Sequence, residues 1–251
     1  MADAPTACLL IIGDEILSGR TQDANLKFLG ERLAAMGIRL KEARVIPDVP
    51  DVIVDTLNAL RTAHTYVFTT GGIGPTHDDI TTACVARAFG RAVIRHPEAV
   101  KKLVAYYGHV PNDARLKMAE MPDGPDVALI ENRATAAPGF RIGNVFVMAG
   151  IPSIARAMFE AAAPSLQGGD PMFSNHVDAE IKEGDIAAEL TAIQERYPHV
   201  SIGSYPFARD GRFTVSIVAR STDKAAIAAA LDEVAAMMTS KGSAPILGVS
   251  P

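Results

Sequence analysis

Two loops rich in glycine and acidic residues each follow a predicted strand. Residues 13–20, GDEILSGR, follow the unbroken apolar run 7–12, and residues 71–79, GGIGPTHDD, follow the segment 65–70. A short apolar run of this kind is typical of a strand buried on both faces of a parallel sheet. In such sheets ligands bind beyond the carboxyl ends of the strands. We therefore expect both loops to line one crevice.

The second loop combines features that suit a phosphate. Gly71, Gly72 and Gly74 would let the backbone approach a ligand closely, and a helix opening near Asp78 would aim free N–H groups at an anion. The carboxylates of Asp78 and Asp79 would repel that phosphate unless a divalent cation bridged them. The loop therefore predicts a site for metal plus phosphate.

A purely structural interpretation of the same residues stays open. Thr76 would be a helix N-cap with Asp79 three residues later, an arrangement like a capping box that needs no ligand. Asp14 and Glu15 on the first loop would add metal ligands, or would cap a helix or lie solvated.

Some basic side chains are candidates for neutralising phosphate charge. They are Arg20, Arg115 and Lys117, although each taken alone is a common surface residue. His77 would donate to a ligand or transfer a proton, or would be an exposed turn histidine. The other histidines show no metal-ligand spacing.

Familiar catalytic motifs are not matched. A P-loop needs four residues between its glycines and then Lys, whereas Gly13 and Gly19 are separated by five and followed by Arg20. A dinucleotide fingerprint beginning at Gly72 would need glycine where His77 stands. The chain also lacks the G-x-S-x-G elbow of acyl hydrolases.

Apolar periodicity places these loops in an α/β fold. Leu26, Leu29, Leu33 and Met36 recur at helical spacing before Gly37. With strands at 7–12, 41–46 and 65–70 and a helix carrying residues 53–60, this makes a βαβαβ unit with a parallel sheet. The pattern further predicts helices at 81–89, 98–107, 112–120 and 153–163, and strands at 140–142 and 145–148.

A turn-rich segment at 164–171 marks the predicted domain boundary. The domains would then be residues 1–166 and 170–251. The second is predicted to be a small α+β domain of βαββα order. Its elements would be strands at 172–181, 200–205 and 212–220, and helices at 186–197 and 227–238.

Composition narrows the class of protein. The 251 residues are 48% hydrophobic and 21% charged, which suffices for a sizeable core. The net charge of −5 provides no broad basic surface, so a nucleic-acid partner is not expected. Cys8 and Cys84 are predicted to be buried hydrophobes. The longest apolar stretch at the N-terminus, 7–12, is too short for a signal sequence or membrane span, which favours a soluble cytoplasmic protein without a membrane partner.

These motifs together resemble the MoaB/Mog family of molybdopterin-binding-like proteins. The segments that carry the resemblance are 13–19, 70–81, 137–140 and 150–152, and they span about the first 165 residues. The family includes molybdopterin adenylyltransferases and the N-terminal domain of CinA. A closer similarity is to the molybdopterin-binding-like domain of FAD synthases, because Gly203-Ser-Tyr-Pro206 also matches and extends the likeness over nearly the whole chain.

The resemblance implies a three-layer α/β domain and a set of site residues. Catalytic roles would fall to Asp79, Asp78 and Asp14, and the same three with Glu15 would hold the metal. The ligand or its phosphate would contact Gly71, Gly72, Gly74, Pro75, Thr76, Thr81, Ser18, Gly139 and Gly150. Ala149 departs from the family pattern, which has proline there.

Function follows as an expectation from the same resemblance. The leading hypothesis is a hydrolase of nucleotide pyrophosphates such as FAD or ADP-ribose, releasing AMP with Mg²⁺, Mn²⁺ or Co²⁺ and with K⁺ as a further candidate ion. The alternatives are molybdopterin binding, with or without adenylyl transfer, and a binding module without catalysis. Nicotinamide-nucleotide amidase and FAD-forming domains do not follow in these residues, so neither activity is expected. Self-association is common in the family, and the apolar helices would serve it or the core equally well.

Overall fold

The computed structural model describes residues 4–209 and 211–248. The chain forms two compact units, Met1–Gly169 and Asp170–Pro251. The outer ends of the two predicted domains, residues 1–3 and 249–251, lie outside the described residues. Each unit has its own hydrophobic core and is described separately.

The first unit is built on a mixed sheet in the order β2-β1-β3-β8-β7-β6. The first four of these strands are parallel, which confirms the predicted parallel arrangement for that part. Strand β7 is antiparallel to both β8 and β6. Only Gly143 and Asn144 connect β7 to β8, and a parallel crossover would need a much longer connection. The strands are β1 (Thr6–Ile12), β2 (Arg39–Ile46), β3 (Tyr66–Thr70), β6 (Val127–Ile130), β7 (Gly139–Ile142) and β8 (Val145–Met148).

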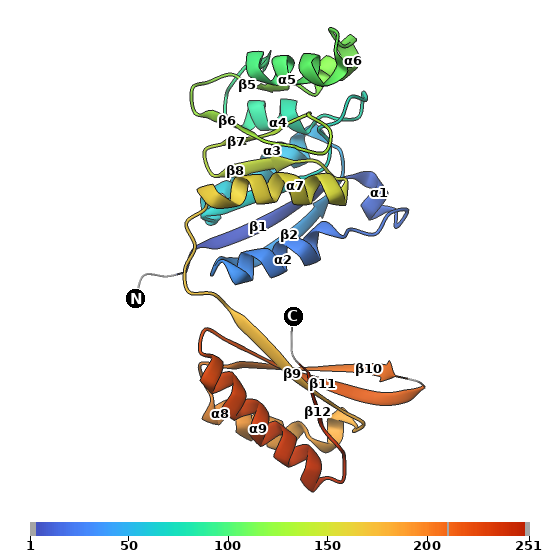
Figure 1. Cartoon of the computed structure of the whole chain (residues 1–251), viewed down its shortest axis with the longest axis vertical. Helices are drawn as coiled ribbons and strands as arrows, with labels where there is room; N and C mark the ends of the chain where they lie inside the picture. Colours follow the sequence, from blue (N-terminus) through green and yellow to red (C-terminus); the bar gives the residue numbers. More distant parts are fainter. Residues whose placement is uncertain (1–3, 210, 249–251) are drawn as a thin grey trace. The chain divides into compact units, whose positions relative to one another are not determined.

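Helices cover both faces of this sheet, which makes the predicted three layers (Figure 1). Alternate residues of β1 point to opposite faces, so Leu9 packs toward one helix pair and Leu10 toward the other. The first face is covered by α2 (Asn25–Ala35) and α7 (Pro152–Ala162), and the second by α3 (Pro50–Ala63) and α4 (Thr81–Ala88). Both faces of the strand are therefore buried, as its unbroken apolar sequence predicts.

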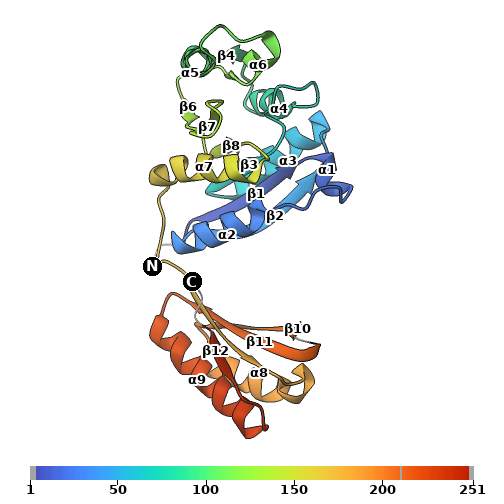
Figure 2. The same cartoon turned by 45° about the vertical axis from the view of Figure 1, so that its right-hand side comes forward.

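A smaller lobe follows α4, and one of its helices is shorter than the sequence predicted (Figure 2). The predicted helix at 112–120 is only α6 (Asp113–Lys117), and Glu120 already belongs to a strand. Asn112 caps the helix by accepting from the Arg115 amide at 3.0 Å, and Pro122 ends a strand that pairs with β4. The other elements are β4 (Val93–Arg95), α5 (Pro97–Tyr107) and β5 (Glu120–Pro122). The sequence did not predict β4, β5 or β6, which have only three or four residues each.

The second unit confirms the predicted βαββα order and adds one short strand. Its sheet has the order β10-β11-β9-β12, with helices packed on one core. The elements are β9 (Phe173–Ala179), α8 (Ala187–Arg196), β10 (Ser201–Arg209), β11 (Arg212–Ser221), α9 (Lys224–Ser240) and β12 (Ile246–Gly248), with 3-10 turns η1 (Ala163–Ser165) before it and η2 (Glu183–Asp185) within it. Strand β12 pairs with the free edge of β9.

Two further expectations concern the core and membranes. Cys8 and Cys84 are buried free cysteines, as predicted. In the part of the chain that the structure describes, no helix is long and apolar enough to cross a membrane.

Candidate functional site

The two predicted loops and the Gly150 loop meet at one edge of the first sheet. Gly71 follows β3, and its amide donates to the Met148 carbonyl at the end of β8 at 3.2 Å. The amide of Gly13 after β1 donates to the carbonyl of Ile46 at the end of β2, also at 3.2 Å. A Cβ at Gly150 would lie 3.3 Å from the Gly71 Cα. The carboxyl ends of the four parallel strands thus carry loops that are in contact.

The Asp79 carboxylate holds the 71–79 loop in shape. One oxygen, Oδ1, accepts from the Gly74 amide at 2.6 Å. The other accepts from the Thr76 amide at 2.7 Å and from the Thr76 hydroxyl at 2.5 Å. A Cβ at Gly74 would lie 2.6 Å from Asp79 Oδ2, so the glycine leaves room for this contact. Asp79 is therefore first an organiser of the loop.

The helix after this loop lies in the predicted range 81–89, but it does not open near Asp78. Its first residue is Thr81 and its N-cap position is Ile80, so Thr76 is not the N-cap. The Thr76 and Asp79 pair is real but lies within the loop. The Thr81 amide donates to the Gly72 carbonyl at 2.9 Å, which anchors the helix start under the glycines. Thr81 is completely buried, and its hydroxyl has no partner among the described residues.

Backbone conformation makes glycine necessary at the start of this loop. Gly71 has φ +105° and Gly72 has φ +68°. A Cβ at Gly71 would collide with the Ile12 carbonyl oxygen, and one at Gly72 with the Thr81 hydroxyl. These glycines allow strands β1 and β3 to end side by side while the chain turns sharply.

Gly71→Ala is expected to lower the free energy of unfolding by about 3 kcal/mol, because a left-handed conformation and an overpacked contact act together. Gly19→Ala is the matched control, since Gly19 has φ +73° but nothing within 4 Å of its Cβ position. That control should lose only about 1 kcal/mol. Urea unfolding measures both values, and equal losses would contradict the predicted collision with the Ile12 carbonyl.

Lys117 is the predicted cation that the structure brings to the loop. Its Nζ donates to the Thr76 carbonyl from α6, which lies 41 positions away in the sequence. The residue is half-buried, and it forms no ion pair with any residue in the described ranges. Arg115 instead stacks over the Tyr107 ring at 4.5 Å, and Arg20 is exposed. Lys117 thus has donors left for an anion.

Some of the loop amides are also free to donate. The N–H groups of Gly72 and Ile73 make no hydrogen bond to any residue that the structure describes. Neighbouring amides are occupied: Gly71 donates to Met148, and Gly74 and Thr76 donate to Asp79. An ammonium and two adjacent amides on one loop suit an anionic oxygen.

Asp48 is a site residue that the sequence analysis missed. Its Oδ2 accepts from the Asp14 amide at 3.0 Å, which ties the end of β2 to the short helix α1 (Asp14–Leu17). Burial raises the pKa of the Asp48 carboxyl, and the negative charges of Asp14, Glu15 and Asp78 raise it further. The available signal was that Asp48 follows a buried strand end, just as Asp14 does.

The carboxylates fit a hydrated divalent cation better than a cage made by protein alone. Asp14, Asp48 and Asp78 offer hard oxygen ligands, and the charges of Asp14 and Asp78 lie close enough to Asp48 to add to the effect of burial in raising the pKa of its carboxyl. Across residues 4–209 and 211–248, no three His, Cys, Asp or Glu side chains converge as a preformed metal site. Mg²⁺ commonly needs only one or two carboxylates and keeps several waters. Both carboxylate oxygens of Asp79 accept hydrogen bonds from the loop, so Asp79 is not assigned as a metal ligand.

The remaining predicted residues lie at or beside this edge. Pro75 and His77 are exposed on the loop, and Ser18 donates to the Glu15 carbonyl at 3.3 Å within the first loop. Gly139 begins β7, where a Cβ would collide with the Val147 carbonyl. Packing against β8 therefore explains the glycine at this position without a ligand.

Ala149, which stands where the family pattern has proline, makes a contact that proline could not make. The Ala149 amide, which proline would lack, donates to the Met158 sulfur at 3.4 Å. The next residue, Gly150, accepts from the Asn25 side chain at 2.9 Å. Asn25 is buried at the start of α2, so it links this helix to the Gly150 loop.

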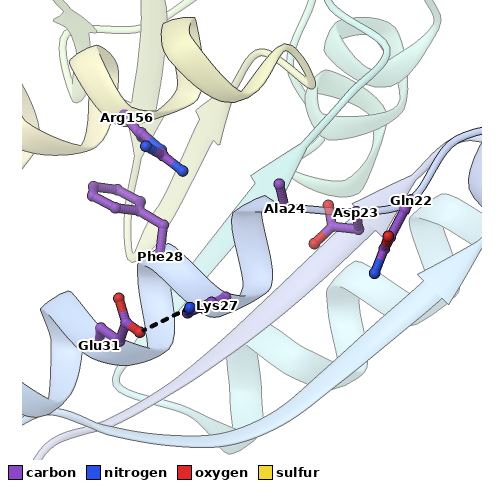
Figure 3. A pocket seen from close by; sticks show the side chains of 7 residues that line it. All are labelled: Gln22, Asp23, Ala24, Lys27, Phe28, Glu31 and Arg156. Atoms are coloured by element: carbon purple, nitrogen blue, oxygen red, sulfur yellow. Dashed lines mark ion pairs between the residues drawn. The ribbon is translucent and has the colours of Figure 1, made fainter. Parts of the chain in front are cut away.

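A surface groove of about 500 Å³ lies beside the start of α2 and under α7 (Figure 3). Most of its polar side chains already have a partner in the chain. Asp23 accepts from the Leu26 amide at 2.8 Å, Lys27 pairs with Glu31 at 3.9 Å, and Arg156 lies over the Phe28 ring. Because the Lys27 and Glu31 side chains are mostly exposed, their pair contributes little. The loop edge therefore remains the stronger candidate site.

Comparison with known proteins agrees with this fold. The family model described as "Probable molybdopterin binding domain" matches residues 8–168. The chain belongs to the molybdopterin-binding-domain family. A second model, "FAD synthase, middle domain", matches residues 171–245, which lie in the second unit.

Relatives of this family member include a CinA-like protein and a probable FAD synthase. A CinA-like protein of Salinibacter ruber is 31% identical over 96% of this chain, which covers 61% of that protein. A probable FAD synthase of Caenorhabditis briggsae is 28% identical over 84% of this chain and 45% of the synthase. The crystal structure of CinA from Thermoplasma acidophilum, described as of unknown function, is 30% identical with a TM-score of 0.60. The match covers 64% of this chain and 98% of the CinA chain. The chain also spans 62% of a related Aeropyrum pernix protein.

Proposed function

We propose that this chain hydrolyses a nucleotide pyrophosphate such as FAD or ADP-ribose and releases AMP. The observation that carries the proposal is the contact of Lys117 with the Thr76 carbonyl on the same 71–79 loop whose Gly72 and Ile73 amides have no partner among the described residues. A half-buried ammonium that forms no ion pair among the described residues and two unused N–H groups suit phosphate oxygens.

The residues of the chain divide the work in this proposal. Lys117 and the two amides hold the pyrophosphate and stabilise negative charge that develops on it, while Asp79 keeps the loop in the required shape. One or two of the carboxylates of Asp14, Asp48, Asp78 and Glu15 would hold a hydrated divalent cation. When bound, such a cation polarises a phosphoryl oxygen and lowers the pKa of a bound water.

The relatives support a nucleotide ligand without identifying the reaction. One is named a probable FAD synthase, and the second unit matches the middle domain of that enzyme. Because this chain spans only 45% of that relative, the synthase reaction itself is not proposed here.

The proposal is tested by incubating the full chain with FAD and with ADP-ribose under Mg²⁺, Mn²⁺ or Co²⁺, each with and without K⁺. AMP release is followed by chromatography, and EDTA provides the metal-free control. We expect AMP only in the presence of a divalent cation. Absence of AMP under every cation would overturn the proposal.

Molybdopterin binding is the second candidate, favoured by the description of the model that matches residues 8–168. In that case calorimetry would detect pterin binding, and adenylyl transfer would require both pterin and ATP. A binding module without catalysis would bind one of these ligands and turn over none.

A further inference from the structure

The second unit contains a pocket of about 410 Å³ that the proposed function does not use. In β9, Val177 and Ala179 face the helices within the core, so Asp178 between them faces the opposite side of the sheet. Thr214 on β11 precedes the core residue Val215 and faces the same side as Asp178. These two polar side chains line the pocket together with the loop before β12.

Both side chains are buried with unused hydrogen-bonding capacity. The Asp178 side chain is 9% exposed and Thr214 is 3% exposed. Asp178 Oδ1 and the Thr214 hydroxyl have no partner among the described residues. His176 Nε2 stays 3.8 Å from Asp178 Oδ1, which is too far for a hydrogen bond. Burying such groups unsatisfied is costly, so the pocket favours a donor between them.

Arg209 pairs with this carboxylate from a half-exposed position, with its guanidinium over the Phe207 ring at 5.2 Å. Its guanidinium donates to Asp178 Oδ2 at 2.8 Å from the end of β10, but its side chain is 49% exposed. The neighbouring charge of Glu180 is already balanced by Arg212 at 3.2 Å. If Arg209 moves into solvent, Asp178 is left as a buried charge that needs a cation.

We propose that this pocket binds a small molecule through a primary ammonium group that replaces Arg209 on Asp178. An ammonium is compact and carries three donors, so it can bond both to Asp178 and to the Thr214 hydroxyl. The hydrocarbon part of the ligand would lie against Ile246, which is 60% exposed at the rim. This site lies wholly within the second unit and is independent of the hydrolase proposal.

The test titrates the full, ¹⁵N-labelled chain with n-butylammonium chloride and, as the neutral control of the same shape, n-butanol. We expect saturable shifts of the amide signals of Asp178, Thr214 and residues 243–246 with the ammonium only. Arg209→Gln removes the competing cation, so its apparent Kd should fall by about tenfold. Asp178→Asn should abolish binding.

Thr214→Val keeps the side-chain volume and guards against a folding defect in Asp178→Asn. It should weaken binding by about fivefold while the spectrum remains folded. No saturable shift in either the wild type or Arg209→Gln would show that Asp178 and Arg209 form a structural ion pair only, and would overturn the proposal. Equal shifts with n-butanol would overturn the ammonium assignment.

Discussion

Asp79→Asn is expected to lower the rate of AMP release by about 100-fold or more. The carboxylate accepts three hydrogen bonds from the loop, from the Gly74 amide and from the amide and hydroxyl of Thr76. Asparagine keeps one oxygen acceptor but presents an NH₂ donor to another N–H group. The loop would then leave the shape that keeps the Gly72 and Ile73 amides free to donate.

Comparison with Thr76→Val distinguishes a change in loop shape from the loss of one hydrogen bond. Thr76→Val removes only the hydroxyl and leaves both amide bonds to Asp79, so its rate should fall by less than about tenfold. Asp55→Asn, on the exposed surface of α3, is the control for loss of a carboxylate and should be unchanged. Thermal melting checks folding in every variant. Full activity of folded Asp79→Asn would contradict the role given to this residue.

Lys117→Met should lower kcat/KM for the pyrophosphate substrate by about 100-fold, because a charge-assisted contact to the phosphate is lost. The change keeps most of the side-chain volume. Stability should change little, since Lys117 donates only to an exposed carbonyl, that of Thr76, and forms no ion pair within the described residues.

Arg115→Met is the matched control from the same helix. Its guanidinium stacks on Tyr107 in α5, so kcat/KM should stay within about threefold of the wild type. If both variants lost activity equally, the effect would come from damage to α6. If Lys117→Met kept full activity, Lys117 would not be a phosphate ligand and the main support for the proposed function would be gone.

Much of the first unit was predictable because burial leaves a local pattern. The apolar run 7–12 becomes β1 with Leu9 and Leu10 in separate cores, and the spaced leucines from position 26 lie in α2. The α6 region was not predictable, since residues 112–120 suit a helix while Glu120 pairs with Arg95 in a strand. That pairing depends on a partner far away in the sequence.

The candidate site was also predictable in part from the sequence. The types and order of residues in 13–20 and 71–79 were enough to predict that two loops meet at the carboxyl end of a sheet, because parallel strands place their ends together. The partners within the site came from the folded chain. Asp14 meets Asp48 across 34 positions, and Thr76 meets Lys117 across 41. Local periodicity records which side chains are buried, whereas contacts between distant residues depend on how the elements pack, which no short segment encodes.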